Sequence, residues 1–170
     1  VPSAHQTAIG SSGSKPSLSQ KVCRYGCLSY LMPTNRALRN GRSLYKLIVH
    51  FAINEETLII GHSSGASLAL ILTQQNKQIV GSVVCVSVLH DNSLQWEPNN
   101  RLFDVKFDWA RIRTNTKELL LIHSDNDPYV PLEQAQYVAG RCKAELITVS
   151  GQGHFNLEQS EEYREFPGLL

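Results

Sequence analysis

The chain has 170 residues, 42% of them hydrophobic, and a formal net charge of +1 at pH 7. A chain of this length buries about 70% of the surface that its unfolded form exposes, so we expect one globular domain. It contains no apolar run of about 18 residues and no apolar leader, so it predicts neither a membrane span nor a secretory signal. We therefore expect a soluble, cytoplasmic protein.

The first third of the chain is basic. Residues 1–52 contain seven Lys or Arg and no Asp or Glu. Such asymmetry can mark a nucleic-acid-binding arm, but the basic residues are scattered without interleaved aromatic residues, which favours a solvated surface. Residues 1–22 are rich in serine and lack periodicity, so we expect a loop or disordered segment there and a domain over residues 23–170.

From residue 53 onward, short apolar runs alternate with helical patterns. Buried strands are predicted at residues 57–62, 79–88, 118–123 and 144–150, and helices at residues 65–78, 131–142 and 156–170. Residues 89–118 form a polar connection that contains several aromatic side chains. This alternation indicates an α/β fold whose mostly parallel sheet carries helices on both faces.

Gly61, Ser63 and Gly65 form a G-x-S-x-G pattern between a predicted strand and a predicted helix. The same arrangement makes the nucleophile elbow of α/β-hydrolases, in which the serine has a strained backbone and its neighbours lack bulk. Ser64 is the alternative nucleophile. The pattern centres Ser63, however, and leaves the backbone N–H of Ser64 to stabilise an oxyanion.

A serine nucleophile needs a histidine base, and the histidine needs a carboxylate partner. Asp125 and Asp127 follow one predicted strand, and His154 lies in a glycine-rich loop after the next, in the chain order that this fold requires. Either aspartate could be the acid. His123 ends a strand and is expected to be a structural, hydrogen-bonded group. His62 is expected to point away from the nucleophile.

A metal-dependent site is the competing interpretation of the same residues. His123, Asp125, Asp127 and His154 are all ligand types, but they lack a supporting second cluster, and a metal site would leave the serine elbow unexplained. The cysteines show no paired C-x-x-C spacing typical of zinc sites. We therefore expect no metal and no cofactor.

Three ordered segments, IIGHSSGA, HSDNDPYVP and GQGHFN, with FDWARI before the second, resemble the small serine hydrolases of the retinoblastoma-binding protein 9 and YdeN-like family. The resemblance covers residues 55–170 and implies a single-domain α/β-hydrolase-like fold with a minimal cap. It assigns Ser63 as the nucleophile, His154 as the base and Asp127, directly before a proline, as the acid. It also allows a catalytically weak protein that binds a protein partner.

The connection over residues 89–118 stands where larger hydrolases insert a lid, and its length suffices only for a small cap. A small cap favours compact substrates, so we expect hydrolysis of small esters or activated amides through an acyl-enzyme. His90, Trp96 and Trp109 are expected to line the substrate pocket.

A second oxyanion donor normally comes from a loop after an early strand. The nearest candidate is the backbone N–H of Gly10, within residues 9–14, but no apolar strand precedes it. Residues 36–50 are basic where the similar proteins are acidic and helical. Two explanations stay open: genuine divergence, or a disturbed coding frame in the N-terminal segment.

Overall fold

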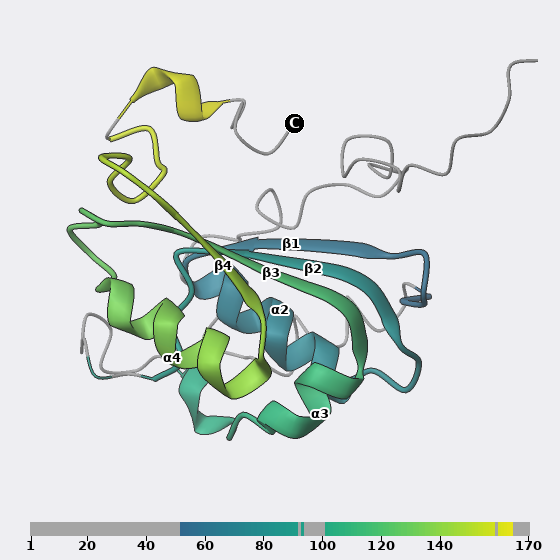
Figure 1. Cartoon of the computed structure of the whole chain (residues 1–170). Helices are drawn as coiled ribbons and strands as arrows, with labels where there is room; N and C mark the ends of the chain where they lie inside the picture. Colours follow the sequence, from purple (N-terminus) through teal and green to yellow (C-terminus); the bar gives the residue numbers. More distant parts are fainter. Residues whose placement is uncertain (1–51, 92, 94–100, 159, 165–170) are drawn as a thin grey trace, which may run out of the picture.

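The computed structural model describes residues 52–91, 93, 101–158 and 160–164, as Figure 1 shows. The described elements, in chain order, are β1 (Leu58–His62), α2 (Ser64–Gln75), β2 (Val80–Val86), the 3-10 helix η4 (Arg101–Asp104), α3 (Trp109–Thr114), β3 (Thr116–Ser124), α4 (Leu132–Cys142), β4 (Glu145–Val149) and the 3-10 helix η5 (Glu161–Arg164). The predictions for residues 1–51 and for Trp96 lie outside these residues.

The four strands form one parallel sheet in the order β1-β2-β3-β4. His62 and Val86, the last residues of β1 and β2, pair with each other, and Val86 pairs with Ile122, two residues before the end of β3. Ser124 and Val149, the last residues of β3 and β4, also pair. The carboxyl ends of parallel strands, and the loops that follow them, therefore meet at one edge of the sheet. This edge carries the candidate site.

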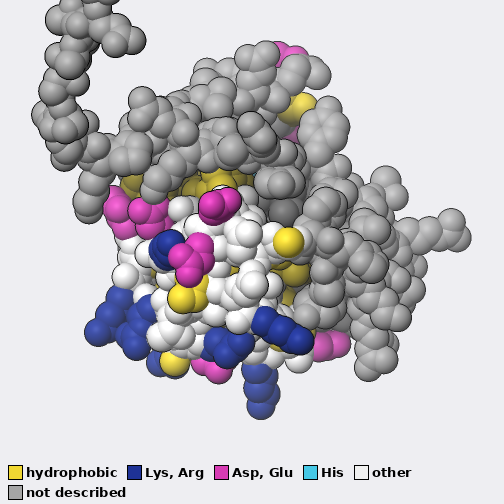
Figure 2. Space-filling model, turned by 90° about the vertical axis from the view of Figure 1, so that its right-hand side faces the viewer, with side chains coloured by type: hydrophobic (Ala, Val, Ile, Leu, Met, Phe, Trp, Pro, Cys, Tyr) yellow, Lys and Arg dark blue, Asp and Glu magenta, His cyan; other side chains and the backbone are white. Residues whose placement is uncertain are grey.

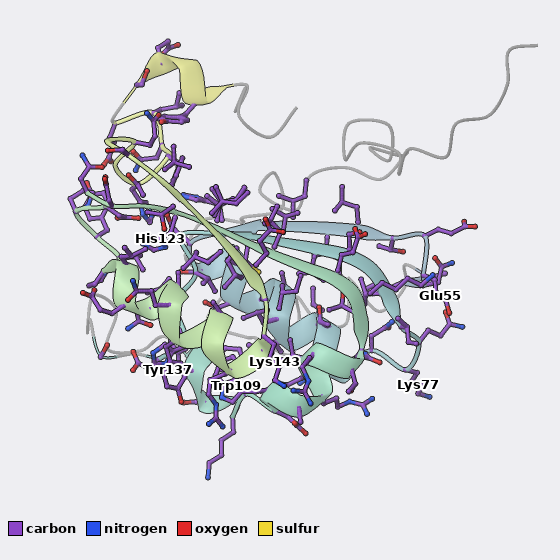
Figure 3. The ribbon with its side chains drawn as sticks, in the orientation of Figure 1. Glu55, Lys77, Trp109, His123, Tyr137 and Lys143 are labelled. Atoms are coloured by element: carbon purple, nitrogen blue, oxygen red, sulfur yellow. The ribbon has the colours of Figure 1, made fainter. Side chains whose placement is uncertain are left out.

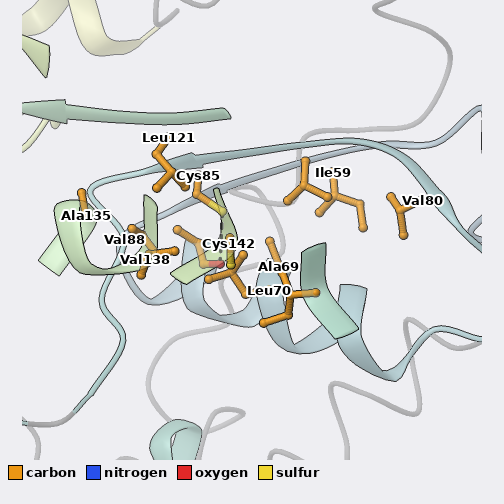
Figure 4. Packing of buried hydrophobic residues seen from close by; sticks show 13 residues of the cluster. Ile59, Ala69, Leu70, Val80, Cys85, Val88, Leu121, Ala135, Val138 and Cys142 are labelled. Atoms are coloured by element: carbon orange, nitrogen blue, oxygen red, sulfur yellow. Dashed lines mark hydrogen bonds between the residues drawn. The ribbon is translucent and has the colours of Figure 1, made fainter. Parts of the chain in front are cut away.

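Helices α2, α3 and α4 cover one face of the sheet (Figure 1). Ile59, Cys85 and Leu121 from the strands pack there against Leu70 and Val138 from the helices, as Figure 4 shows. Each of these side chains is at most 2% exposed, so the core is dry and closely packed. This burial explains why the predicted strands appear in the sequence as continuous apolar runs.

The opposite face of the sheet is also apolar. Val84, Val86 and Ile122 form a second buried cluster with Phe155, and Tyr163 packs against it. The described part of the chain contributes no α-helix to this face (Figure 1). The α/β class with a parallel sheet is confirmed, and the α-helices within the described ranges all lie on one side.

The four predicted strands and the first two predicted helices are confirmed. The helix α3 within the predicted connection is an addition: the Asp108 carboxylate caps it by accepting the N–H of Arg111 at 3.0 Å, a signal that FDWARI carries. The terminal helix predicted from residue 156 is wrong for the described residues. Residues 156–158 form a turn, and the one element that follows within residues 160–164 is the 3-10 helix Glu161–Arg164.

None of the helices within the described residues has both the length and the apolar character needed to cross a bilayer.

Candidate active site

Ser63 occupies the turn between β1 and α2 with φ 55° and ψ −125°. Positive φ is rare for a residue with a side chain and costs on the order of 1–3 kcal/mol, so such residues persist where the surroundings hold them. Here the N–H of Ser63 donates to the carbonyl oxygen of Val86 at 2.8 Å. The end of β2 therefore holds the elbow in its strained conformation.

Gly61 is required by packing. A Cβ on Gly61 would overlap the carbonyl of Gly65 and come within 2.7 Å of Cα of Ala66, so the first turn of α2 could not approach β1. A Cβ on Gly65 would meet no atom within 4 Å. Of the two glycines in the pattern, the first is therefore the one that the close approach of strand and helix demands.

Ser64 begins α2, and its backbone N–H belongs to the first turn of the helix. Helix geometry leaves the first N–H groups without an intrahelical acceptor, and the aligned peptide dipoles favour negative charge at this end. The Ser64 N–H next to Ser63 is therefore placed to donate to an anionic oxygen at this end of the helix.

Asp127 and His154 form a buried acid–base pair. Nδ1 of His154 lies 2.8 Å from Oδ2 of Asp127, and the two side chains are 9% and 0% exposed. A carboxylate can only accept, so Nδ1 carries the proton, and in the neutral ring Nε2 is free to take one. This is the tautomer that a general base needs.

The Asp127 carboxylate accepts hydrogen bonds from several directions. Oδ1 accepts the backbone N–H groups of Tyr129 and Val130, each at 2.9 Å, and Oδ2 accepts the Ser87 hydroxyl at 2.8 Å. Burial alone would raise the pKa of Asp127, but these bonds and the one from His154 outweigh it and lower the pKa to about 2. Asp127 is therefore ionised throughout the neutral range.

Asp125, the alternative acid, holds the loop of His154 instead of its ring. Oδ1 of Asp125 accepts the N–H of Gly151 at 2.8 Å. The neighbouring Ser124 and Asn126 accept the N–H groups of the next two loop residues, Gln152 and Gly153, at 2.9 and 2.8 Å. Three consecutive side chains thus hold three consecutive backbone N–H groups, just before the residue that pairs with Asp127.

His62 contacts His154. Its Nε2 donates to the carbonyl oxygen of His154 at 2.7 Å, and the two ring centroids are 4.7 Å apart. Burial, and then repulsion from a charged His154, lower the pKa of His62 to about 4, so it is neutral at pH 7. The sequence assigned His62 no role at the site, because nothing local shows that residues 62 and 154 meet.

His123 is a structural group, as expected. It is fully buried in β3, and its Nε2 donates to the carbonyl oxygen of Val130 at 2.8 Å. Burial lowers the pKa of His123 and keeps it neutral, although Oδ2 of Asp127 is only 3.9 Å away. Figure 3 shows it at the same end of the sheet as the site.

Two of the expected pocket residues belong to an aromatic cluster beside α4. The ring of His90 stacks on Tyr137 at 4.1 Å, and Trp109 meets Tyr137 edge-on at 5.8 Å while stacking on Phe107 at 4.8 Å. Figure 3 shows Trp109 and Tyr137 well away from His123. The structure brings His90 and Trp109 together through Tyr137. Trp96 and Gly10 lie outside the described residues.

The opposite edge of the sheet differs in character. In Figure 2, which views the molecule from that side, Lys, Arg, Asp and Glu side chains gather, and no histidine of the described residues is visible. The ion pair between Lys117 and Glu55, 2.6 Å long and exposed, is typical of this edge. In the described part of the chain, moreover, no three His, Cys, Asp or Glu side chains form a group that could hold a metal ion.

Comparison with known proteins identifies the family. The chain matches the serine hydrolase family over residues 46–168. It belongs to this family. Among the relatives of this serine hydrolase is the rat (Rattus norvegicus) protein named Serine hydrolase RBBP9, with 27% identity over 146 residues, which are 86% of this chain and 76% of the relative.

Solved structures agree on the α/β-hydrolase fold of the serine hydrolase. The ydeN gene product of B. subtilis matches with a TM-score of 0.67 at 21% identity, covering 81% of this chain and 77% of the other. The esterase domain of a Rhodothermus marinus protein matches with a TM-score of 0.58 at 18% identity, covering 80% and 68%. The resemblance to RBBP9/YdeN-like α/β-hydrolases is thus confirmed.

Ser87 of this serine hydrolase was not among the predicted site residues, yet its hydroxyl donates to the Asp127 carboxylate. Ser87 is also one of four residues other than glycine with positive φ in the described chain; the others are Ser63, Lys143 and Phe155. A serine at the end of an apolar strand carries no local sign of either property. Only the expectation that loops after parallel strands meet at one edge could have suggested it.

Proposed function

We propose that Ser63, His154 and Asp127 form a catalytic triad that hydrolyses small esters or activated amides through an acyl-enzyme, without a metal or another cofactor. The observation that carries the proposal is the 2.8 Å hydrogen bond from Nδ1 of His154 to Asp127, at the sheet edge where Ser63 holds a strained elbow. The contact of His62 with the His154 carbonyl supports the approach of the two loops, because His62 precedes Ser63 directly.

In the proposed reaction, Oγ of Ser63 attacks the carbonyl carbon of the substrate while Nε2 of His154 takes the hydroxyl proton. The tetrahedral intermediate then collapses, the bond to the leaving group breaks, and His154 returns the proton to the departing alcohol or amine. A water molecule next attacks the acyl-enzyme with the same base, which releases the acid and restores Ser63. Ionised Asp127 stabilises the imidazolium in both halves.

The oxyanion needs two donors. The N–H of Ser64 at the start of α2 is one, by its place in the helix. We propose the N–H of Gly10 as the second donor, and this residue lies outside the described residues. Loss of one such donor typically costs about a hundredfold or more in rate.

The preference for small esters is proposed from the short connection between β2 and β3, which allows only a small cap. The fold shared with an esterase domain is compatible with it. That His90, Trp96 and Trp109 line the substrate pocket stays a prediction, and the distance of Trp109 from His123 in Figure 3 argues against a place for Trp109 beside the triad. The cytoplasmic location stays a prediction.

A fluorophosphonate probe tests the proposal directly, since it reacts with an activated serine. We expect the wild-type protein to be labelled at Ser63 and to hydrolyse p-nitrophenyl acetate faster than longer acyl esters. Ser63→Ala should abolish both signals, whereas Ser64→Ala, which keeps the backbone N–H, should retain them. A folded wild-type protein that is neither labelled nor active would contradict the triad and favour the alternative of a protein-binding module.

A further inference from the structure

Ser87 is the residue directly after β2, and its backbone is unusual. Its φ is 49°, in the left-handed region that costs a residue with a side chain free energy, and it is 0% exposed. Glycine would adopt this backbone at lower cost. The backbone of this turn does not require a serine, so we attribute the presence of Ser87 to its hydroxyl.

The hydroxyl of Ser87 donates a hydrogen bond to Asp127, the acid of the proposed triad. Oγ of Ser87 donates to Oδ2 of Asp127 at 2.8 Å, and this is the same oxygen that Nδ1 of His154 contacts at 2.8 Å. The other carboxylate oxygen is already bound by two backbone N–H groups. Asp127 is thus fixed at both oxygens, and Ser87 is the one side chain besides His154 that donates to Oδ2 within the described residues.

The backbone around Ser87 ties the same turn to the neighbouring elements. The N–H of Ser87 donates to the carbonyl oxygen of Ile122 in β3 at 3.0 Å. The carbonyl oxygen of the preceding residue, Val86, accepts the N–H of Ser63 at 2.8 Å. Two consecutive residues at the end of β2 therefore hold the elbow on one side and the acid on the other.

We propose that Ser87 is a positioning residue for the triad, whose hydroxyl holds Oδ2 of Asp127 toward His154 and shares the negative charge of that oxygen. The proposal rests on the triad proposed above. A hydrogen bond to a charged group is stronger than one between neutral groups, and in a buried site it also fixes direction. Ser87 thus sets both the orientation of the acid and the charge that faces the base.

The charge effect has a definite sign. The ionisable groups near Asp127 are His154 at 2.8 Å, His123 at 3.9 Å and Tyr129, whose phenol donates to Glu158 and meets the His154 ring edge-on. His62 faces His154 from β1. His62 and His123 are both neutral near pH 7, since burial lowers the pKa of each. Without the Ser87 hydroxyl, more charge on Oδ2 faces His154, so the protonated base is favoured and activity is lost at a higher pH.

Two variants distinguish the effect of the Ser87 hydroxyl from the effect of the Ser87 backbone conformation. Ser87→Ala and Ser87→Gly both remove the hydroxyl, but only Ser87→Gly also relieves the positive φ, so it should be more stable than Ser87→Ala. We expect both to lower kcat/KM for p-nitrophenyl acetate by about tenfold to a hundredfold, the factor for one hydrogen bond to a charged group. In both, the acid limb of the kcat/KM profile should move to higher pH.

The matched control is Ser82→Ala. Ser82 lies on the same strand, and its hydroxyl donates to the carboxylate of Glu118 at 3.0 Å, away from the site. This variant should keep the wild-type rate and profile. Ser87 variants that fold and keep the wild-type rate, or whose acid limb stays or moves to lower pH, would overturn the inference. Failure of the triad itself is distinguishable, because the wild-type protein would then not be labelled by the fluorophosphonate.

Discussion

The imidazole of His62 lies against that of His154, with ring centroids 4.7 Å apart, and its Nε2 donates to the His154 carbonyl oxygen at 2.7 Å. The residue before the proposed nucleophile therefore holds the backbone of the proposed base. This contact joins the last residue of β1 to the loop that follows β4, although the two strands are at opposite edges of the described sheet.

Replacing His62 tests this contact. His62→Ala removes the donor to the His154 carbonyl, so we expect the loop to lose its fixed position and kcat/KM to fall by about tenfold. His62→Gln keeps an N–H donor of similar reach and should retain more activity. Steady-state kinetics on p-nitrophenyl acetate compares them, and equal loss in both variants would show that the hydrogen bond is not the cause.

The same histidine makes folding stability depend on pH. The pKa of His62 falls from 6.5 to about 4 on folding, so between these values the unfolded chain binds a proton that the folded chain does not. The free energy of unfolding should therefore rise with pH over this window, by on the order of 2–3 kcal/mol, and this contribution is lost as pH falls through about 4. Urea unfolding at several pH values measures it.

The His62→Gln variant serves as the control for this pH dependence. Glutamine does not titrate, so its unfolding curves should change less between pH 6.5 and 4 than those of the wild-type protein. Asp127 acts at lower pH, since its pKa falls from 3.8 to about 2 and its contribution is lost as pH falls between those values. Equal slopes in the variant and the wild-type protein between pH 4 and 6.5 would contradict the assignment to His62.

The two aspartates of the acidic turn should differ sharply in their effect on catalysis. Asp127→Asn removes the charge and favours the wrong tautomer of His154, so we expect kcat to fall by about four orders of magnitude. Asp125→Asn keeps an oxygen that can accept the Gly151 N–H, and Asp125 is exposed, so a fall of tenfold or less is expected. A larger loss in Asp125→Asn would reverse the assignment of the acid.

The two glycines of the elbow should differ in their effect on folding. Gly61→Ala places a methyl group against the backbone of α2, within 2.7 Å of Cα of Ala66, and should destabilise the protein by several kcal/mol. Gly65→Ala meets no atom within 4 Å and stands in the first turn of a helix, so its stability should be unchanged or up to about 1 kcal/mol higher. Thermal unfolding of both variants gives the comparison.

The strands, two helices and the order of the site residues could be predicted from the sequence alone. Apolar runs such as VGSVVCV mark buried parallel strands because burial on both faces acts on every residue of the run, and that information is local. The G-x-S-x-G pattern is local as well, since the close approach at Gly61 involves a strand and the helix that directly follows it. Such patterns did not predict the short helix α3, and they wrongly predicted a helix where the structure has a turn after residue 155.

Tertiary structure alone determined which partners these residues have. Asp125 and Asp127 are two positions apart in one turn, and only the geometry of that turn directs Asp127 to the His154 ring and Asp125 to the loop backbone. Ser87 and His62 acquire their contacts because the register of parallel strands brings separate loops to the same edge. Patterns in a sequence report how deeply a residue is buried, whereas hydrogen-bond partners depend on distances between segments far apart in the chain.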